Sequence, residues 1–278
     1  GAVFNEDSAD VDFRVESNGN ANMLFVDGGN DKVGIGTSAF VDTSKVQIEG
    51  AKALTSGILQ GQLNISDSTA VATGAGGGIS FSGNYNGTSK TTFGSIEGSK
   101  DNGTSGHYGA SLVFKTRSNG GANAENMRID SSGNVTMPAQ PAFSVHKNGT
   151  DQNDIGTGDV TVTWAAERFD VGSNFGAAGF TAPVTGKYQL QASIRFDNLD
   201  ASHNYMMVVI KTSNENYRFI IDPDFGQDAA FFTISGSILA DMDASDTAII
   251  FVTRDGGASI SDIDGDAEYT HFSGFLAC

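Results

Sequence analysis

The stretch FTAPVTGKYQLQASIRF (residues 180–196) decides the fold. In its second part every second residue is apolar, and polar residues fill the positions between: Tyr188, Leu190, Ala192, Ile194 and Phe196 are the apolar set. Successive side chains of a β-strand point to opposite faces, so this alternation predicts a strand with one buried and one outward face. Pro183 and Gly186 precede the alternation and predict a turn before the strand.

The same signal recurs through the second half of the chain. Short apolar segments alternate with turn residues there, and no helical period is present. Strands are expected at 142–147, 160–167, 179–183, 186–196, 205–214, 217–222, 229–242, 246–256 and 270–277. This spacing of strands and turns is typical of a β-sandwich.

The first half has a different composition. Residues 1–140 hold 23 of the 36 glycines, and they contain a repeat in which 12–40 aligns with 113–143. Both copies read as strand, SNG turn, strand, glycine turn and strand, with apolar residues in period two. A weak helix is expected at 43–61, interrupted by Gly50 and Gly57.

The first half has too few large aliphatic residues for a core of its own. A single copy cannot bury enough apolar surface to offset the loss of chain entropy. Three chains around one axis would supply the missing core and cover the exposed strand edges. We therefore expect a trimeric β-stalk; a single-chain solenoid and a disordered linker are the alternatives.

The predicted domains follow from these differences. Residues 1–137 form a glycine-rich β-stalk, 138–141 a linker bounded by Pro138 and Pro141, and 142–278 a head. Residue 1 is Gly rather than Met, so we expect a fragment of a longer chain. The fold class is all-β: an elongated trimeric stalk followed by a sandwich.

Two motifs in the head resemble a known family. Phe-x-Ala-Pro-x-x-Gly-x-Tyr begins at Phe180, and the stretch Phe-Ser-Gly-Phe-Leu begins at Phe272. Together with the segments around them they resemble the C1q-like/tumour-necrosis-factor-like jelly roll over 141–278. The resemblance implies a compact homotrimer that binds ligands on its outer face and performs no catalysis.

The stalk has a second resemblance. MLFVDGGNDKVGIGT (23–37) and NMRIDSSGNV (126–135) are similar to repeats of bacteriophage tail-fibre proteins. No collagen-like Gly-X-Y run is present, although animal C1q relatives often carry one.

Composition narrows the function further. The formal net charge is −17, which disfavours nucleic acid as a partner. No apolar run is long enough for a transmembrane helix, so we expect no membrane insertion. The only cysteine is Cys278, which excludes a disulfide within one chain. The GAGGG run at 74–78 lacks the Lys-Ser/Thr ending of a phosphate loop, and we expect no catalytic residues and no organic cofactor.

One acidic segment suggests a metal. Asp262, Asp264 and Asp266 offer carboxylate oxygens at alternate positions around Gly265, which suits Ca²⁺. The segment lacks the later bidentate Glu of a calcium loop, and a solvated acidic loop is the alternative.

The expected function is host attachment. We expect a virion fibre of the tail, head or neck, extracellular, joined to other virion proteins through a missing or N-terminal segment. The trimeric head would bind a host surface glycan or protein, and the candidate contacts are Asn204, Tyr205, Tyr217, Asp224 and Phe225. A secreted or surface-attached bacterial adhesin, lectin-like in character, is the alternative. A polysaccharide-degrading tailspike is a weaker one.

Overall fold

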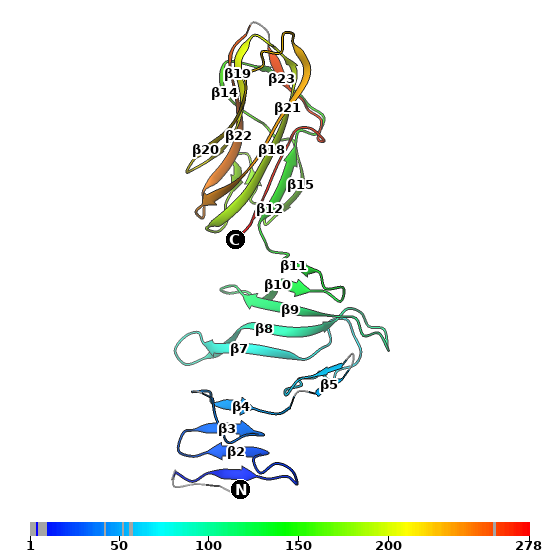
Figure 1. Cartoon of the computed structure of the whole chain (residues 1–278), viewed down its shortest axis with the longest axis vertical. Coiled ribbons are helices and arrows are strands. Elements are labelled where there is room, and N and C mark those ends of the chain that lie inside the picture. The colour runs from blue at the N-terminus through cyan, green and yellow to red at the C-terminus, as the bar shows by residue number, and fades with distance from the viewer. Residues whose placement is uncertain (1–3, 5–9, 42, 52, 56–57, 258–259) are drawn as a thin grey trace. The chain divides into compact units, whose positions relative to one another are not determined.

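A computed structural model describes residues 4, 10–41, 43–51, 53–55, 58–257 and 260–278 (Figure 1). For residues 53–55 and 58–60 it describes the backbone alone. The secondary structure of these residues is β-strand without any helix, which confirms the all-β prediction. Accordingly, none of the described residues belongs to a helix that could cross a membrane. The chain divides into two compact units, residues 1–113 and 114–278.

The first unit contains small antiparallel elements and one parallel pair. β1 to β4 form one sheet in chain order, with β3 and β4 parallel. β5 and β6 form a hairpin, and β7 and β8 form a longer one. The bounds are β1 (Phe13–Val15), β2 (Leu24–Asp27), β3 (Lys32–Ile35), β4 (Val46–Ile48), β5 (Ala53–Thr55), β6 (Ile58–Gln60), β7 (Gly78–Asn84) and β8 (Lys90–Lys100).

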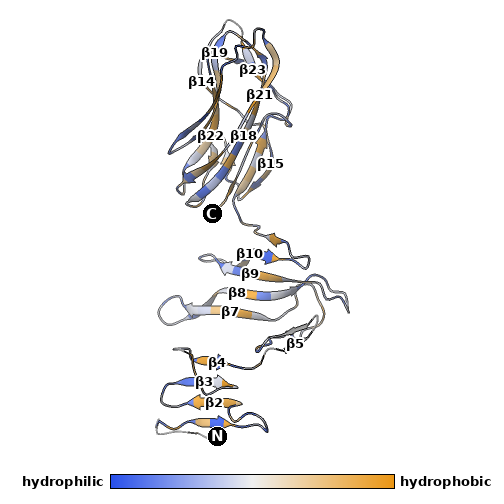
Figure 2. Ribbon diagram, in the orientation of Figure 1, coloured by the Kyte–Doolittle hydropathy of each residue, from blue (hydrophilic) through white to orange (hydrophobic). Residues whose placement is uncertain are grey.

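This unit buries few apolar side chains, although its strands carry them, as along β2 in Figure 2. Val113 is the one fully buried hydrophobic residue among its described positions. Many large apolar side chains are exposed instead, including Phe81 at 53% and Phe93 at 48%. The described residues of the first unit therefore form almost no core within one chain.

The helix expected at 43–61 is wrong for the described residues. β4 (Val46–Ile48), β5 and β6 occupy this segment. Val46 to Ile48 pair with Val33 to Ile35 in the parallel ladder. Gly50 and Gly57 weaken a helix, and β-branched residues pack well on a sheet, so pairing with β3 prevails over a weak helical period.

The second unit begins inside β9 (Ala110–Arg117) and contains the hairpin β10 (Asn123–Ile129) and β11 (Val135–Thr136). Residues 137–141 contain no strand, and β12 follows them. The boundary at 138–141 that the sequence suggested differs from the division after Val113, and it stays a prediction.

A sandwich of two antiparallel sheets makes up the rest of this unit. The first sheet has the order β13-β23-β18-β24-β12-β15, with β21 along the other edge of β18. The second has the order β16-β17-β22-β19-β20, with β14 paired to β22. The bounds are β12 (Ala142–His146), β13 (Gln152–Ile155), β14 (Gly158–Thr161), β15 (Ala166–Val171), β16 (Phe175–Gly176), β17 (Gly179–Thr181), β18 (Gly186–Leu199), β19 (His203–Thr212), β20 (Asn216–Ile221), β21 (Ala229–Met242), β22 (Thr247–Gly256), β23 (Ser261–Ile263) and β24 (His271–Leu276).

The connections between these strands are those of a jelly roll. From β17 to β22 the chain passes repeatedly from one sheet to the other, and β24 returns to lie between β12 and β18. Such returns produce Greek-key connectivity in a double-sheet fold. The head is therefore a β-sandwich with the strand connectivity of a jelly roll, as the resemblance of the sequence motifs implied.

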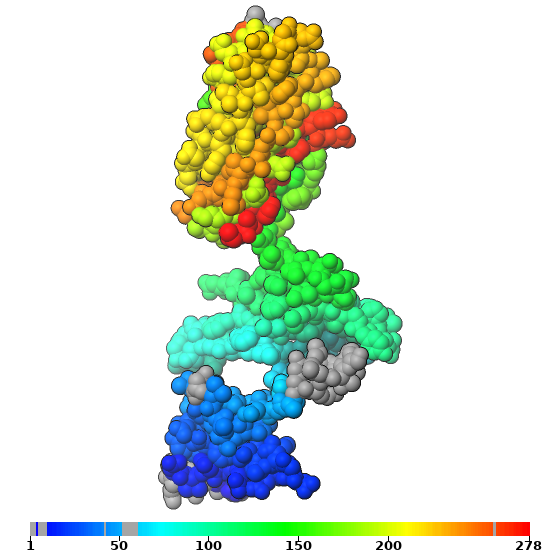
Figure 3. All heavy atoms as spheres, in the orientation of Figure 1, coloured from blue at the N-terminus to red at the C-terminus, as the bar shows by residue number. Residues whose placement is uncertain are grey.

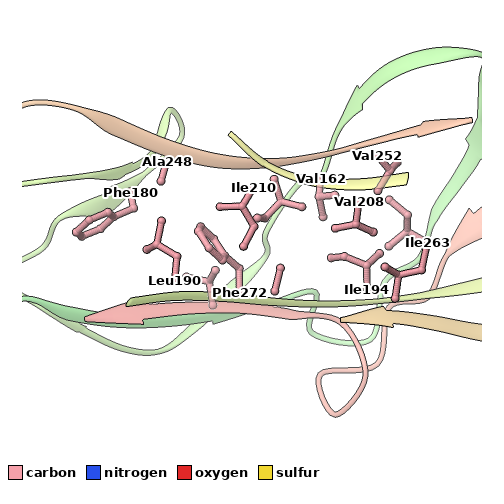
Figure 4. Close-up of a cluster of buried hydrophobic side chains, with 14 of the residues drawn as sticks. Val162, Phe180, Leu190, Ile194, Val208, Ile210, Ala248, Val252, Ile263 and Phe272 are labelled. Atoms are coloured by element: carbon pink, nitrogen blue, oxygen red, sulfur yellow. The ribbon is translucent and has the colours of Figure 1, made fainter. Parts of the chain in front are cut away.

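The core lies between the two sheets. Leu190, Ile194 and Phe272 of the first sheet face Val208 and Ile210 of the second (Figure 4). The alternation that predicted β18 is confirmed, because Tyr188, Leu190, Ala192, Ile194 and Phe196 are all fully buried. The Tyr188 hydroxyl, carried into this core, donates a hydrogen bond to the Val184 carbonyl over 2.8 Å.

Gly274 explains why Phe-Ser-Gly-Phe requires glycine at its third position. A Cβ there would lie 2.6 Å from Leu190 Cδ2, 2.9 Å from Phe143 Cε1 and 3.0 Å from the Gln189 carbonyl oxygen. The neighbours come from both adjacent strands, so no single side chain can move aside to make room.

We expect Gly274→Ala to lower the free energy of unfolding by about 1 to 3 kcal/mol, because the added methyl overpacks the core. Urea unfolding followed by the fluorescence of the single tryptophan, Trp164, measures this within the sandwich. Gly156→Ala is the control, since no atom lies within 4 Å of a Cβ there. Equal midpoints for the two variants would contradict the packing argument.

Candidate functional site

The strands β18, β19, β22 and β23 meet at one end of the sandwich (Figure 1), and acidic residues are frequent in the sequence at this end. The loops after β18, after β20 and after β23 lie there. Ala201 N donates to Asp228 Oδ1 over 3.0 Å, and Ser261 Oγ donates to the Asn198 carbonyl over 3.2 Å. We call this region the acidic end; its aspartates are Asp200, Asp222, Asp224, Asp228, Asp255, Asp262, Asp264 and Asp266.

Arg195 is the cation at the centre of the acidic end. Its Nη2 lies 2.8 Å from Asp264 Oδ2, and its Nε lies 3.2 Å from Asp197 Oδ1. Its guanidinium carbon also lies 4.5 Å from the centre of the Phe231 ring and 4.3 Å from that of Tyr269. Two carboxylates and two aromatic rings therefore fix this side chain, which is only 16% exposed.

Burial and neighbouring opposite charges shift the pKa values of Arg195 and Asp264 in opposite directions. Burial by itself would lower the pKa of Arg195, but the hydrogen bond to Asp197 and the charges of Asp264 and Asp197 raise it overall. Burial, together with the charges of Asp197 and Asp266, raises the pKa of the Asp264 carboxyl, although the Asp266 amide and the charge of Arg195 act to lower it. Ionised Asp264 is therefore tolerated at this depth because Arg195 compensates its charge.

Two of the three predicted calcium ligands, Asp262 and Asp264, already accept hydrogen bonds from the protein. Asp262 Oδ1 accepts a hydrogen bond from Asp154 N over 2.8 Å, and Asp264 Oδ1 accepts one from Asp266 N over 2.9 Å. Asp266 is exposed. Within the described part of the chain, no three His, Cys, Asp or Glu side chains are grouped to hold a metal ion. The calcium site stays a prediction.

Four of the five predicted receptor contacts lie at the acidic end. Exposed Asn204 donates through Nδ2 to Asp255 Oδ2 over 2.9 Å, and Tyr205 pairs with Asp255 in the sheet. Asp224 is exposed, and Phe225, 45% exposed, stacks on Phe232 with ring centres 5.4 Å apart. Carboxylate acceptors and an accessible aromatic ring are thus brought together.

Tyr217 lies elsewhere. Ile221 at the end of β20 pairs with Met206, whereas Tyr217 pairs with Ile210. Four residues of strand separate Tyr217 from the acidic end, about 13 Å at the usual rise per residue. Tyr217 is half-buried and packs against the core, so the structure does not place it with the other four.

Buried polar groups hold the acidic end together from inside. His203 is 2% exposed, with Nδ1 3.1 Å from the Gly256 carbonyl oxygen and Nε2 3.2 Å from Ser261 Oγ. Arg254 donates to the carbonyls of Ile155 over 2.5 Å and Gly256 over 3.0 Å. The loops that present the exposed carboxylates are therefore fixed by hydrogen bonds to buried side chains.

Sequence reasoning missed Arg195 and His203. Arg195 occupies an outward position of the alternating strand, where a polar residue is unremarkable. Its one signal is that basic residues are rare in the head, since residues 141–278 hold 7 Lys and Arg against 19 Asp and Glu. His203 carries no local signal, since its partners come from a segment more than 50 residues later.

We expect Arg195→Gln to lower the free energy of unfolding by about 3 kcal/mol at neutral pH, because Asp264 is left as a buried unpaired charge. The pKa of Asp264 then rises further above its unfolded value, so its protonation at lower pH relieves the penalty. The deficit should shrink as the pH falls from about 7 toward about 5. Denaturant unfolding at several pH values measures both effects.

Lys187→Gln is the control for the Arg195 substitution. It removes an ion pair of similar length, in which Lys187 Nζ lies 2.6 Å from Asp241 Oδ1. The side chains of Lys187 and Asp241 are 45% and 73% exposed. Exposed pairs contribute little, so we expect a change below about 0.5 kcal/mol. A pH-independent deficit in Arg195→Gln would contradict the charge argument.

Comparison with known proteins gives similarity in structure only. No protein-family profile matches the chain, and no curated protein matches its sequence. The globular domain of zebrafish complement 1qA is similar at 17% identity and a TM-score of 0.35, over 50% of this chain and 98% of that one. Murine APRIL is similar at 14% identity and a TM-score of 0.36, over 49% and 98%. Eiger TNF from S. frugiperda is similar at 12% identity and a TM-score of 0.33, over 50% and 94%. The jelly-roll assignment itself rests on the strand order of this chain.

Proposed function

We propose that the chain is a virion structural fibre protein, a homotrimer whose jelly-roll head attaches to the host cell surface. The observation that carries this proposal is that the described residues of 1–113 form almost no core. Copies of the same chain would supply the partners that these strands lack.

The first unit supports association of several copies. Its strands keep the alternation of apolar and polar residues, yet Ile79, Phe81 and Phe93 are 45 to 53% exposed. Apolar side chains exposed in this number favour burial against another surface. Strands that cannot close a core within one chain are typical of chains that fold around each other in a shaft.

The head offers a second surface for the same association. On the outer face of the first sheet, Gln189 pairs with Leu239 of β21 on one side and with Phe275 of β24 on the other. Leu239 is 57% exposed and Phe275 49%, and Phe169 of β15 is 50% exposed nearby in the same sheet. Figure 3 shows β21, coloured yellow to orange, at the surface of this unit. We propose that this face packs against the same sheet of two other copies.

Closed threefold symmetry would bury both the exposed apolar side chains of the first unit and the outer face of the first sheet of the head. A cyclic assembly buries the same patch in every copy and leaves no open end. Three copies of the acidic end would then be presented together, and multivalent contact strengthens weak individual binding. This arrangement suits adsorption to a surface that displays many receptors.

We expect light scattering to give three times the mass of one chain. Phe275→Glu should shift the protein to a smaller species, because three carboxylates would be buried in the proposed interface. The matched control is Ile220→Glu on β20 of the second sheet, where Ile220 is 61% exposed and which should stay trimeric. A folded monomer of the unmodified chain in dilute buffer would contradict the proposal.

Immunoelectron microscopy tests whether the protein is part of a virus particle. Antibodies raised against the purified chain should label projecting fibres on virus particles from the source of the sequence. Label on bacterial surfaces in cultures that contain no particles would favour the adhesin instead. Adsorption of the particles should also fall when soluble trimer is added in excess, since free heads compete for the receptor.

A further inference from the structure

A hollow of about 480 Å³ lies at one edge of the sandwich. β20 and β21 form the other edge. β15 and β16 are the outermost strands of their sheets beside the hollow, and the segment 162–165 crosses between the sheets. Its lining includes Val145, Val162, Trp164, Glu167, Phe175 and Ile249. Small-molecule sites in proteins typically measure about 300 to 1,000 Å³, so the hollow is large enough for a ligand.

Small residues leave this space open. The loop between Phe175 and Phe180 consists of glycine and alanine. A Cβ on Gly176 would meet no atom within 4 Å. The hollow is therefore not filled by the hairpin of β16 and β17.

One wall of the hollow is apolar and carries an aromatic ring. Val145 and Val162 are 1% and 2% exposed and belong to the core, so they form a fixed surface. Trp164, the only tryptophan of the chain, packs on Phe272 with ring centres 6.1 Å apart and 30° between the planes. The indole is thus held from behind and contributes to the lining.

A carboxylate stands beside this apolar wall. Glu167 pairs with Val145 across β12 and β15, and Val145 points into the core. The register of these two strands shifts next to this pair, and Glu167 is exposed and lines the hollow. Its carboxylate oxygens can therefore accept hydrogen bonds from a ligand that enters the hollow.

The polar rim is held in place before any ligand arrives. Gln152 Oε1 accepts hydrogen bonds from Thr163 N over 3.0 Å and from Thr163 Oγ1 over 3.1 Å. Gln152 Nε2 donates to the Thr161 carbonyl over 2.9 Å, and buried Lys147 donates through Nζ to Thr163 Oγ1 over 3.2 Å. A rim fixed in this way lowers the ordering cost of binding.

We infer that the hollow is a binding subsite for one neutral hexose ring of a surface glycan. The apolar face of the ring would lie on the Trp164 indole, and two neighbouring hydroxyls would donate to the Glu167 carboxylate. The inference rests on the proposed function, because the glycan is that of the host surface. Acidic sugars and phosphates are disfavoured by Glu167 and by the net charge of −17.

Titration of the intact protein with methyl glycosides of glucose, galactose, mannose and N-acetylglucosamine tests the inference. Trp164 is the only indole, so its fluorescence reports this hollow alone. We expect a saturable change with at least one of the four sugars. Glu167→Gln keeps the shape of the side chain and should weaken binding of that sugar about tenfold, because charge-assisted hydrogen bonds become neutral ones.

The control is Glu268→Gln, the same change at an exposed glutamate outside the lining, which should leave sugar affinity unchanged. Unchanged affinity in Glu167→Gln, or no saturable response to any of the four sugars, would overturn the inference. A response to choline without a response to sugars would overturn it too, because it would mark a site for cations.

Two readouts separate this inference from the proposed function. If the fibre assignment fails, antibodies will not label virus particles although sugar still changes Trp164 fluorescence. If the subsite fails, fibres will be labelled and the fluorescence will not respond. Glu167→Gln trimer should compete for adsorption less well than Glu268→Gln trimer when both statements hold.

Discussion

Unequal burial of apolar side chains is the constraint on which this protein depends. The sandwich places Phe143, Tyr188 and Phe272 in a dry interior between two sheets. Residues 1–113 use the same alternating pattern, but a single chain gives their apolar faces almost nothing to cover them. Folding is driven mainly by removing apolar surface from water, so the two units differ in what they need from other chains.

The sequence predicted the central strands of the head because burial imposes a strict period there. In β18 every second residue is in the core, and the tyrosine, leucine and phenylalanine at those positions make the period visible. The short strands β13, β16 and β23 escaped prediction because strands of two to four residues cannot show a period. The expected strand at 160–167 is the end of β14, the crossing segment and the start of β15, since the chain changes sheets at Val162.

The candidate site was predicted only in part, for a physical reason. Loop composition indicated where acidic and aromatic residues would be exposed, and Asn204, Tyr205, Asp224 and Phe225 do share one end. Composition could not show that Asp264 pairs with Arg195, because that pairing depends on the register of β18 and β23. The same limit applies to the hollow, because Trp164 and Glu167 line it together with Val145 and Ile249, which come from distant parts of the sequence.

The position of β24 has a consequence for how the head is made. β24 lies between β12 and β18, and His146 and His271 are paired across it although 125 residues separate them in sequence. Until residues 271–276 have been synthesised, β12 and β18 each present an unpaired edge, and the first sheet remains in two pieces. Contacts so distant in sequence form slowly, and open edges invite pairing with the wrong chain. Nascent heads are therefore most vulnerable to aggregation just before this strand inserts, and a chaperone that shields strand edges would help most at that moment.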